Sequence, residues 1–259
     1  MSAVPNLHDM RERLVGAEMR FAYFNAQRTT PGAGEGIRHR TNESFEILLD
    51  PARPMSPYYN RAAVRPGVGV NPEALDSLPS EVTAIETTPA HVDAAVAARL
   101  IERGFAPAYQ LCYLGTAPVG DLPVRRRVQR LDETQVDLFF DLLKSEGVEF
   151  PPQKRAAKRG YYCTPQFRAF IVRDDEHNVC GWTTLFVDDA VGFFGNSFTL
   201  PQYRRAGVHA ALLAARLNEA AELGLEVAYT DVEFGSQSHD NCERAGFRTL
   251  TVNTIWARA

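Results

Sequence analysis

The sequence predicts an α/β protein with a mixed, mostly antiparallel central sheet flanked by helices. Residues 167–200 hold three apolar segments joined by short acidic turns, the pattern of an antiparallel meander. The third segment leads through a basic turn directly into an alanine-rich helix that reaches Ala221. A further strand, a short helix and a last strand ending near Trp256 follow. This order of elements indicates one sheet carrying helices on its faces.

Composition and charge narrow the function class. The chain has 259 residues, of which 45% are hydrophobic, enough for one large core or two small ones. The formal charge is −4, and the two dense basic runs, 125–127 and 154–159, are interpreted as solvated faces. Nucleic-acid-binding domains usually carry a clustered basic excess, so no nucleic-acid partner is expected.

Cysteine spacing and the N-terminus give expectations about metals and location. The four cysteines show no C-x-x-C spacing and no nearby histidine pair, so neither a metal site nor a disulfide framework is predicted. The first residues lack a basic region followed by an apolar core, and no run of about 18 apolar residues occurs. We therefore expect a cytoplasmic protein with no membrane partner.

The first half of the chain mixes helices and short strands. Apolar residues between Leu7 and Phe24 recur in steps of three and four, which predicts an amphipathic helix. Thr88-Pro89 is typical of a helix start, and Gly104 of its end. The other expected features are a mobile loop at 27–42, strands at 44–49, 57–64, 81–86 and 108–114, and turns at 66–79.

A linker is predicted at residues 115–123, which contain two glycines and two prolines. It divides the chain into domains 1–120 and 121–259. In the second, Asp132 and Gln135 have the spacing of a capping box before an amphipathic helix. The elements expected after it are a short helix at 151–162, strands at 167–173, 179–187, 190–200 and 226–232, a helix at 235–247 and a strand at 248–256.

The turn from Arg204 to Gly207 predicts an anion site. The first N–H groups of a helix have no intrahelical partner, and the helix dipole adds partial positive charge. Arg204 and Arg205 add fixed charge, and Gly207 lets the backbone approach a phosphate without a Cβ in the way. A pyrophosphate would fit such a turn.

This turn resembles the acyl-CoA loop of the GCN5-related N-acetyltransferases (GNAT), which reads Gln/Arg-x-x-Gly-x-Gly/Ala. The strand, helix, Gly246-Phe247 and last strand that follow are similar to the second half of the family signature. His209 departs from the last position of the motif, although Ala210 follows it. The resemblance implies an acetyl-CoA site whose cofactor-binding residues would be Phe198, Thr199, Leu200, Arg204, Arg205, Ala206, Gly207, Val208, His209, Ala210 and Asn241.

The resemblance also singles out Cys242. The usual proton donor of the family is a tyrosine four residues before the glycine of Gly-Phe, and Cys242 stands there in this chain. A thiol could protonate the leaving CoA thiolate, but a buried cysteine is also a common small core residue. Among candidate bases, His209 is expected to contact phosphate or solvent and His239 to face water. Asp231 or Glu233 could act through water, and the sequence selects none of these.

The function that the resemblance implies is N-acyl transfer from acetyl-CoA to the primary amine of a small molecule in a ternary complex. The alternative is a CoA-binding regulatory module without turnover, which the missing tyrosine favours. Tyr161 and Tyr162 could line an acceptor pocket, whereas Phe193 and Phe194 are expected in the core. A monomer or homodimer is expected.

The two halves share a faint pattern of helix, Glu-Arg, Gly-Phe and strand, beginning at Glu102 and at Glu243. Two readings remain open: a degenerate GNAT-like first domain that should not hold CoA, or a common helix end followed by a core anchor.

Overall fold

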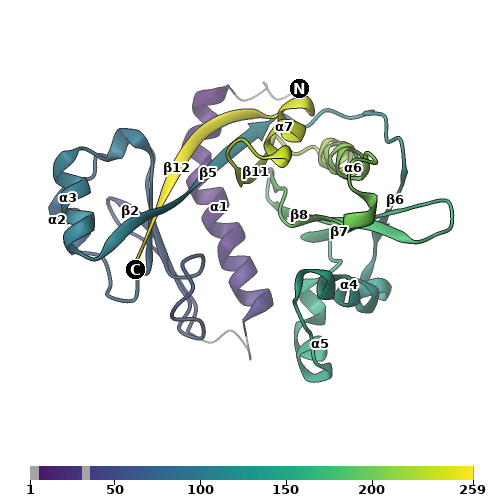
Figure 1. Ribbon diagram of the computed structural model, residues 1–259, viewed down its shortest axis with the longest axis horizontal. Helices are drawn as coiled ribbons and strands as arrows, with labels where there is room; N and C mark the ends of the chain where they lie inside the picture. Colours follow the sequence, from purple (N-terminus) through teal and green to yellow (C-terminus); the bar gives the residue numbers. More distant parts are fainter. Residues whose placement is uncertain (1–5, 31–35, 259) are drawn as a thin grey trace. The chain divides into compact units, whose positions relative to one another are not determined.

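Figure 1 shows the computed structural model of the chain, which describes residues 6–30 and 36–258. The chain forms two compact units. The C-terminal unit comprises Leu114–Asp231 and Gln237–Arg248. The N-terminal unit comprises Asn6–Tyr113, Val232–Ser236 and the last strand from Thr249 onward. Residues 31–35 of the loop expected at 27–42 lie outside the described residues.

The sheet of the C-terminal unit contains the predicted meander. Its strands are β6 (Arg127–Leu131), β7 (Phe167–Arg173), β8 (Val179–Asp188), β9 (Val191–Phe193), β10 (Ser197–Thr199) and β11 (Val227–Glu233). Their order is β11-β9-β8-β7-β6, with β10 pairing β8. The β9–β11 pair is parallel, and the β6–β7, β7–β8, β8–β9 and β8–β10 pairs are antiparallel. The mixed, mostly antiparallel sheet predicted from the sequence is confirmed.

The expected strand at 190–200 is wrong as a single element. It is broken into β9 and β10 because the chain bends at residues 194–196, where Asn196 has a φ of 39°. Thr184 holds the bend, since its Oγ1 donates to the Gly195 carbonyl over 3.0 Å. The break moves β10 away from the line of β9 and leads the chain toward the next helix.

Helices cover both faces of this sheet. One face carries α6 (Val208–Glu222), and the other carries α4 (Val136–Leu143) and α5 (Pro152–Lys158) (Figure 1). The capping box at Asp132 and Gln135 is confirmed, although the first turn is a 3₁₀ helix (η2, Glu133–Gln135). Short 3₁₀ turns η3 (Lys144–Glu146) and η4 (Arg159–Tyr161) follow α4 and α5, and α7 (Gln237–Arg244) precedes the last strand.

The N-terminal unit is also a layered α/β structure. Its strands are β1 (Arg38–Thr41), β2 (Phe45–Leu49), β3 (Arg61–Val64), β4 (Ala84–Thr87), β5 (Phe105–Thr116, which continues past the unit limit) and β12 (Arg248–Arg258). They follow the order β1-β2-β3-β4-β12-β5, and β3 pairs β4 in parallel.

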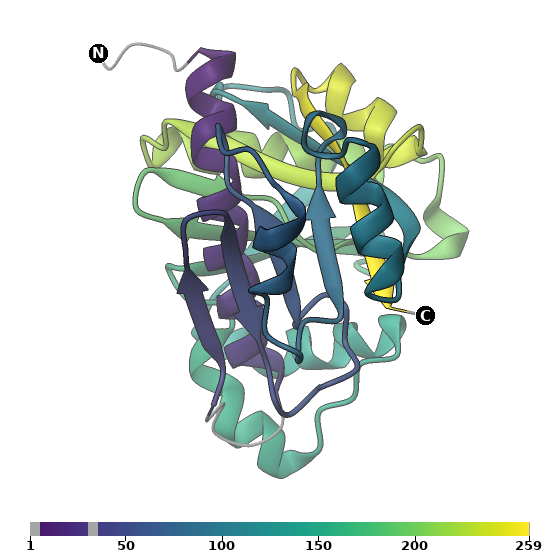
Figure 2. The same cartoon turned by 90° about the vertical axis from the view of Figure 1, so that its left-hand side faces the viewer.

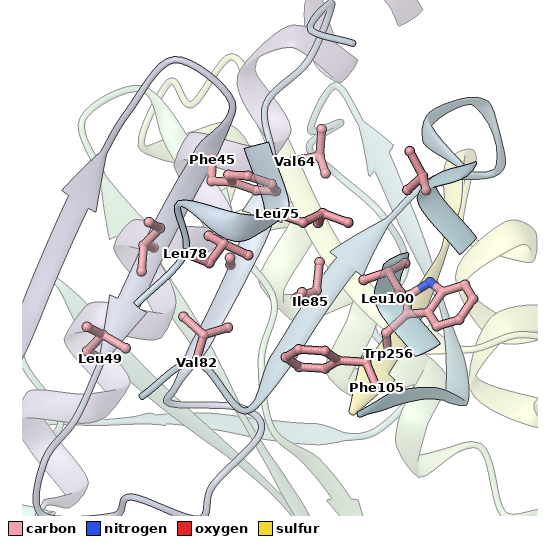
Figure 3. Packing of buried hydrophobic residues seen from close by; sticks show 13 residues of the cluster. Phe45, Leu49, Val64, Leu75, Leu78, Val82, Ile85, Leu100, Phe105 and Trp256 are labelled. Carbon is pink, nitrogen blue, oxygen red and sulfur yellow. The ribbon is translucent and has the colours of Figure 1, made fainter. Parts of the chain in front are cut away.

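Helices lie on both faces of this second sheet, as Figure 2 shows. On one face, α1 (Leu7–Thr29) packs Met19 and Ala22 against Leu48 and Ala63. On the other lie α2 (Pro72–Asp76), η1 (Pro89–His91) and α3 (Ala94–Glu102). The core beneath them, which Figure 3 shows, gathers Phe45, Leu75, Ile85, Leu100, Phe105 and Trp256.

Several local expectations for this unit need correction. The helix expected from Thr88 is interrupted, because Asp93 accepts from the Val96 N–H and starts α3 anew after η1. The strand expected at 57–64 shortens to β3, since residues 57–60 form turns. The strand β1 and the helix α2 arise where a loop and turns were expected.

None of the helices in residues 6–30 and 36–258 is long and apolar enough to span a bilayer.

Candidate functional site

The predicted anion site at Arg204–Gly207, called the cradle below, is a tight loop between β10 and α6. The chain leaves β10, makes one 3₁₀ turn (η5, Pro201–Tyr203), passes Arg204 to Gly207 and enters α6. Arg205 and Gly207 both adopt left-handed backbone conformations, with φ of 62° and 77°. Glycine adopts this region at little cost, whereas a residue with a Cβ, such as Arg205, is uncommon there. At the start of the loop, the Tyr203 hydroxyl donates to Asp174 Oδ2 over 2.8 Å.

The start of α6 is open for an anion. The Ala211 N–H donates to the Gly207 carbonyl over 3.0 Å, so helical bonding begins there. The N–H groups of Val208, His209 and Ala210 precede that bond and have no helical acceptor. Gly207 occupies the cap position, and no side chain caps the helix. These N–H groups and the helix dipole together favour negative charge at this point.

The loop borders a groove of about 740 Å³. Most residues predicted from the sequence to bind the cofactor line it: Phe198, Thr199, Arg204, Arg205, Gly207, Val208, His209, Ala210 and Asn241. Leu200, Ala206 and Cys242 are not among the lining residues. Sequence reasoning missed Ser197, Tyr203, Gln237 and Ser238, which also line it.

The close approach of three elements at Gly181 shapes one wall of this groove. Gly181 on β8 pairs with Thr199 on β10. A Cβ at Gly181 would lie 2.6 Å from the Phe198 carbonyl oxygen and 2.8 Å from Val208 Cγ1. Only glycine therefore lets β10 and the first turn of α6 sit this close to β8.

His209 and Asn241 join α6 to α7 across the groove. Asn241 Nδ2 lies 3.2 Å from His209 Nδ1, a distance at which the amide donates to a neutral imidazole. Burial, together with the nearby Arg216 charge, lowers the pKa of His209 to about 4. The Asn241 oxygen also accepts from Arg244 Nη1 over 2.7 Å. At neutral pH His209 is therefore uncharged and held in place.

The guanidinium of Arg216 is buried near His209. Arg216 on α6 is 2% exposed, and its Nη1 donates to the Thr184 carbonyl over 3.2 Å. Its guanidinium carbon lies 4.4 Å from the centre of the Phe194 ring. No carboxylate pairs with it in residues 6–30 and 36–258, and burial lowers the pKa of Arg216 to about 9. Attraction to the ionised form of the neighbouring Cys242 thiol, itself 2% exposed, opposes that shift.

The sequence model of the acetyltransferase (GNAT) family matches residues 136–247. Residues 136–247 are a GNAT domain. This region holds β7 to β11, the Arg204–Gly207 loop, α6 and α7, so the family match covers the whole groove.

Solved structures, two of them with GNAT descriptions, share the fold of most of the chain. A GCN5-related N-acetyltransferase from Kribbella flavida is 16% identical, with a TM-score of 0.63 over 93% of this chain and 95% of that one. A GNAT-family protein from Novosphingobium aromaticivorans is 19% identical, with a TM-score of 0.50 over 90% and 96%. A conserved protein of unknown function from Staphylococcus epidermidis is 9% identical, with a TM-score of 0.60 over 86% and 94%. No curated protein matches the sequence.

A second groove, in the C-terminal unit, borders the loop at Ala206 and Gly207. It measures about 980 Å³ and is lined by Arg125, Arg126, Arg127 and Arg173 together with Asp174, Asp175, Ala206 and Gly207. Arg126 Nε donates to the Ala206 carbonyl over 2.6 Å and so anchors the loop. The run 125–127 was predicted to be a solvated face. Arg125 and Arg127 are exposed, but Arg126 is partly buried against the GNAT loop.

Other predicted site residues of the GNAT domain have different surroundings. His239 is 8% exposed and does not face water as expected, because the inner side of α7 buries it. Tyr162 is fully buried, and its ring contacts those of Phe139, Phe140, Phe150 and Phe167, so it does not line a pocket. Phe193 and Phe194 are core residues, as predicted. Lys158, in the other basic run, is 2% exposed.

Asp231 and Glu233 lie near the end of β11, and neither lines the groove. In the described part of the chain, no group of three or more His, Cys, Asp or Glu side chains could hold a metal ion.

Proposed function

We propose that the GNAT domain binds acetyl-CoA at the Arg204–Gly207 loop and transfers the acetyl group to the primary amine of a small molecule. The observation that carries this proposal is the open start of α6, which has no side-chain cap, next to a groove large enough for the arm of an acyl carrier. Ligand pockets of about 300–1,000 Å³ are typical for small molecules and cofactors. Both grooves beside the loop fall in this range.

The residues of the loop suit a pyrophosphate. The N–H groups of Val208, His209 and Ala210 would donate to phosphate oxygens, and Arg204 and Arg205, both exposed, would add charge. Four arginines against two aspartates give the second groove a net positive lining, which favours further phosphate groups. The backbone of Phe198 and Thr199, which line the groove beside α6, would bond the amides of the pantetheine arm.

The reaction itself needs little more than positioning and proton transfer. A neutral amine attacks the thioester carbonyl, the C–N bond forms, and the C–S bond breaks when the tetrahedral intermediate collapses. The nitrogen loses a proton and the leaving thiolate gains one. Holding amine and thioester in contact can contribute ~7–11 kcal/mol in favourable cases.

We assign the donated proton to the Cys242 thiol and the stabilisation of negative charge beside it to Arg216. An uncompensated guanidinium in a protein interior is costly, so its retention next to a thiol suggests a role in stabilising an anion. His209, with its low pKa, accepts from Asn241 and is proposed to position α7 and not to act as the base.

Calorimetric titration of acetyl-CoA tests the site. Gly207→Trp should fill the cradle and abolish binding that the wild type shows. Gly224→Trp is the matched control, because Gly224 also has a left-handed φ, 69°, and open space around it at the far end of the same helix. Loss of affinity in Gly207→Trp alone supports acetyl-CoA binding at the Arg204–Gly207 loop. Absence of binding to wild type, or equal losses in both variants, would refute it.

Turnover is the second readout. Acetyl-CoA should be consumed, with release of free thiol, when primary amines are added. Tight binding of acetyl-CoA without thiol release from a broad panel of amines would instead favour the alternative, a CoA-binding module without catalysis. The burial of Cys242 at the position of the family tyrosine is the observation that keeps this alternative open.

A further inference from the structure

The N-terminal unit has a pocket of its own. It measures about 420 Å³ and is bounded by β3, β4, β12 and the inner side of α1. Its walls are mainly apolar and include Leu14, Val64, Pro66 and Leu250. All of its lining residues belong to the N-terminal unit, so it is separate from the acyl-CoA loop.

The pocket lies where two parallel strands separate. The pairing of β3 and β4 runs from Arg61↔Ala84 to Ala63↔Glu86 and then stops. Beyond that point the chain turns away at Pro66 on one side and at Pro89 on the other. The carboxyl ends of diverging parallel strands are a common location for ligands in open α/β sheets. In the C-terminal unit, the groove of the GNAT domain likewise follows the end of its parallel pair, β9 and β11.

Glu86 supplies a buried carboxylate in the pocket wall. It is 4% exposed and is held by two donors, Asn253 Nδ2 to Oε1 over 2.7 Å and Arg61 Nη1 to Oε2 over 3.0 Å. Thr251 Oγ1 in turn donates to Asn253 Oδ1 over 2.7 Å, which fixes the amide. Each carboxylate oxygen can accept a further hydrogen bond. Glu86 is therefore a rigid acceptor at the closed side of an apolar pocket.

The remaining polar groups do not favour a phosphate. His91 lines the pocket with Nδ1 facing the Thr88 N–H at 3.3 Å, and burial lowers its pKa, so the ring is neutral at pH 7. Arg11 also lines the pocket, but it is exposed, and its Nε is occupied by the Leu250 carbonyl at 2.7 Å. The helix that follows β3 is α2, which has only 5 residues. Among the residues that line the pocket, Glu86 is thus the buried charged one.

We propose that this pocket binds a small organic cation, a primary ammonium group on an apolar body, with the ammonium donating to Glu86. The apolar walls bury the body of the ligand, and the Thr251–Asn253–Glu86 chain keeps the acceptor in position. This site needs no acyl-CoA and does not rest on the function proposed for the GNAT domain.

The test is titration of 2-phenylethylamine, which is protonated at pH 7, into the full chain in the absence of acetyl-CoA. 3-Phenylpropionate, of nearly the same shape but opposite charge, is the ligand control. We expect saturable binding of the amine and at least about 10-fold weaker binding of the carboxylate, since charge-assisted hydrogen bonds contribute on this scale.

Two variants, Ala90→Trp and Glu86→Gln, locate the bound amine, and a third serves as their control. Ala90 is exposed and lines the pocket, so Ala90→Trp should block it without disturbing the core. Ala98→Trp, on the exposed side of α3 and away from the pocket, is the matched control and should bind as wild type. Glu86→Gln should weaken the binding of the amine at least about 10-fold. The near-UV circular dichroism of this variant checks that it folds, and Ala90→Trp tests the pocket independently.

Three results would overturn the proposal. These are no saturable binding of the amine to wild type, equal binding of amine and carboxylate, and undiminished amine binding in Ala90→Trp. Failure of acetyl-CoA to bind would leave this outcome untouched, so the two proposals fail independently.

Discussion

Cys242 is the residue on which the proposed chemistry depends most. Its thiol is 2% exposed and neighbours the Arg216 guanidinium. If it protonates the leaving thiolate, Cys242→Ser replaces a thiol by a far weaker acid. We expect turnover to fall by about 10²-fold or more, since general acid terms are typically 10²–10⁴-fold, and the alkaline limb of the pH–rate profile to move. Steady-state rates with an amine acceptor between pH 6 and 10 provide the measurement.

Cys163→Ser is the control for this substitution. Cys163 is also buried, and burial raises its pKa to about 12, so it stays a thiol throughout the range. A profile for Cys242→Ser that matches both wild type and Cys163→Ser would remove Cys242 from the mechanism.

His209 predicts a pH dependence of stability. Its pKa falls from 6.5 in the unfolded chain to about 4 in the folded protein. Between these two pH values the unfolded state therefore binds more protons than the folded state. The contribution of His209 to stability is present above pH 6.5 and is lost as the pH falls toward 4. The contribution amounts to up to about 3 kcal/mol. His209→Asn, which keeps an acceptor for Asn241, should flatten this part of a urea-unfolding series from pH 7 to 4.5. A slope unchanged from wild type would contradict the assignment.

At the scale of residues, most of the site was predicted from members that are adjacent in sequence, and Asn241 from its place in the family signature. Arg204 to Gly207 form a local pattern with a local physical reason, and the structure brings them to one groove. Arg126 reaches the loop from the position just before β6, 80 residues earlier in the chain, and Arg216 is buried on the inner side of α6. Nothing in the sequence around either arginine distinguishes it from a solvated one.

At the scale of elements, the groove depends on how closely β10 approaches β8. Gly181→Ala would place a methyl group against the Phe198 backbone, which cannot rotate away. We expect a loss of stability of about 1–3 kcal/mol and at least about 10-fold weaker acetyl-CoA binding, because the strand that forms the wall must shift. Denaturant unfolding and calorimetry measure the two effects.

Gly192→Ala is the matched control on the neighbouring strand. Its Cβ would meet Leu185 Cδ1 and Leu225 Cδ1, both at 3.1 Å, and these side-chain ends can move. Affinity for acetyl-CoA should stay at the wild-type value. An equal drop in both variants would show that the effect is general to the sheet and not specific to β10.

The elements themselves were largely predictable from periodicity. The long helix α1, the strands β7, β8 and β11, and the capping box before α4 follow from patterns within single segments. The break between β9 and β10 was not predicted, although Gly195-Asn196-Ser197 interrupts the apolar pattern of residues 190–200. The bend comes from a contact with Thr184 on β8, which only the folded sheet provides.

At the scale of the whole molecule, the end of the chain belongs to the N-terminal unit. The family match stops at residue 247, but Thr254 to Ala257 of β12 pair with β4, and Trp256 donates to Thr87 Oγ1 over 3.0 Å. A chain cut after Phe247 should therefore lose the near-UV circular dichroism and the cooperative melting of the N-terminal unit. A chain ending at Ala257 retains these pairs and should melt as the full chain does. Equal melting of both shortened chains would contradict this role of β12.

The fold class could be predicted for the whole molecule, but the membership of its last strand could not. The predicted domain limits, 1–120 and 121–259, place residues 249–258 in the second domain, whereas these residues cluster with the N-terminal unit. The sequence of β12 specifies a strand, but its pairing with β4 depends on the packing of Trp256 in a core that forms from distant segments. The degenerate GNAT-like character of the first half stays a prediction.

The two tryptophans of the chain are divided between the two units, and this makes the protein its own fluorescent reporter. Trp182 on β8 stacks on Phe198, with ring centres 6.3 Å apart, and Phe198 lines the groove of the GNAT domain. Trp256 lies in the core of the N-terminal unit. In Trp256→Phe the remaining indole emission would follow occupation of the acyl-CoA groove, and in Trp182→Phe it would follow the integrity of the other unit. Each unit can thus be followed separately, without a label, in its own single-tryptophan variant.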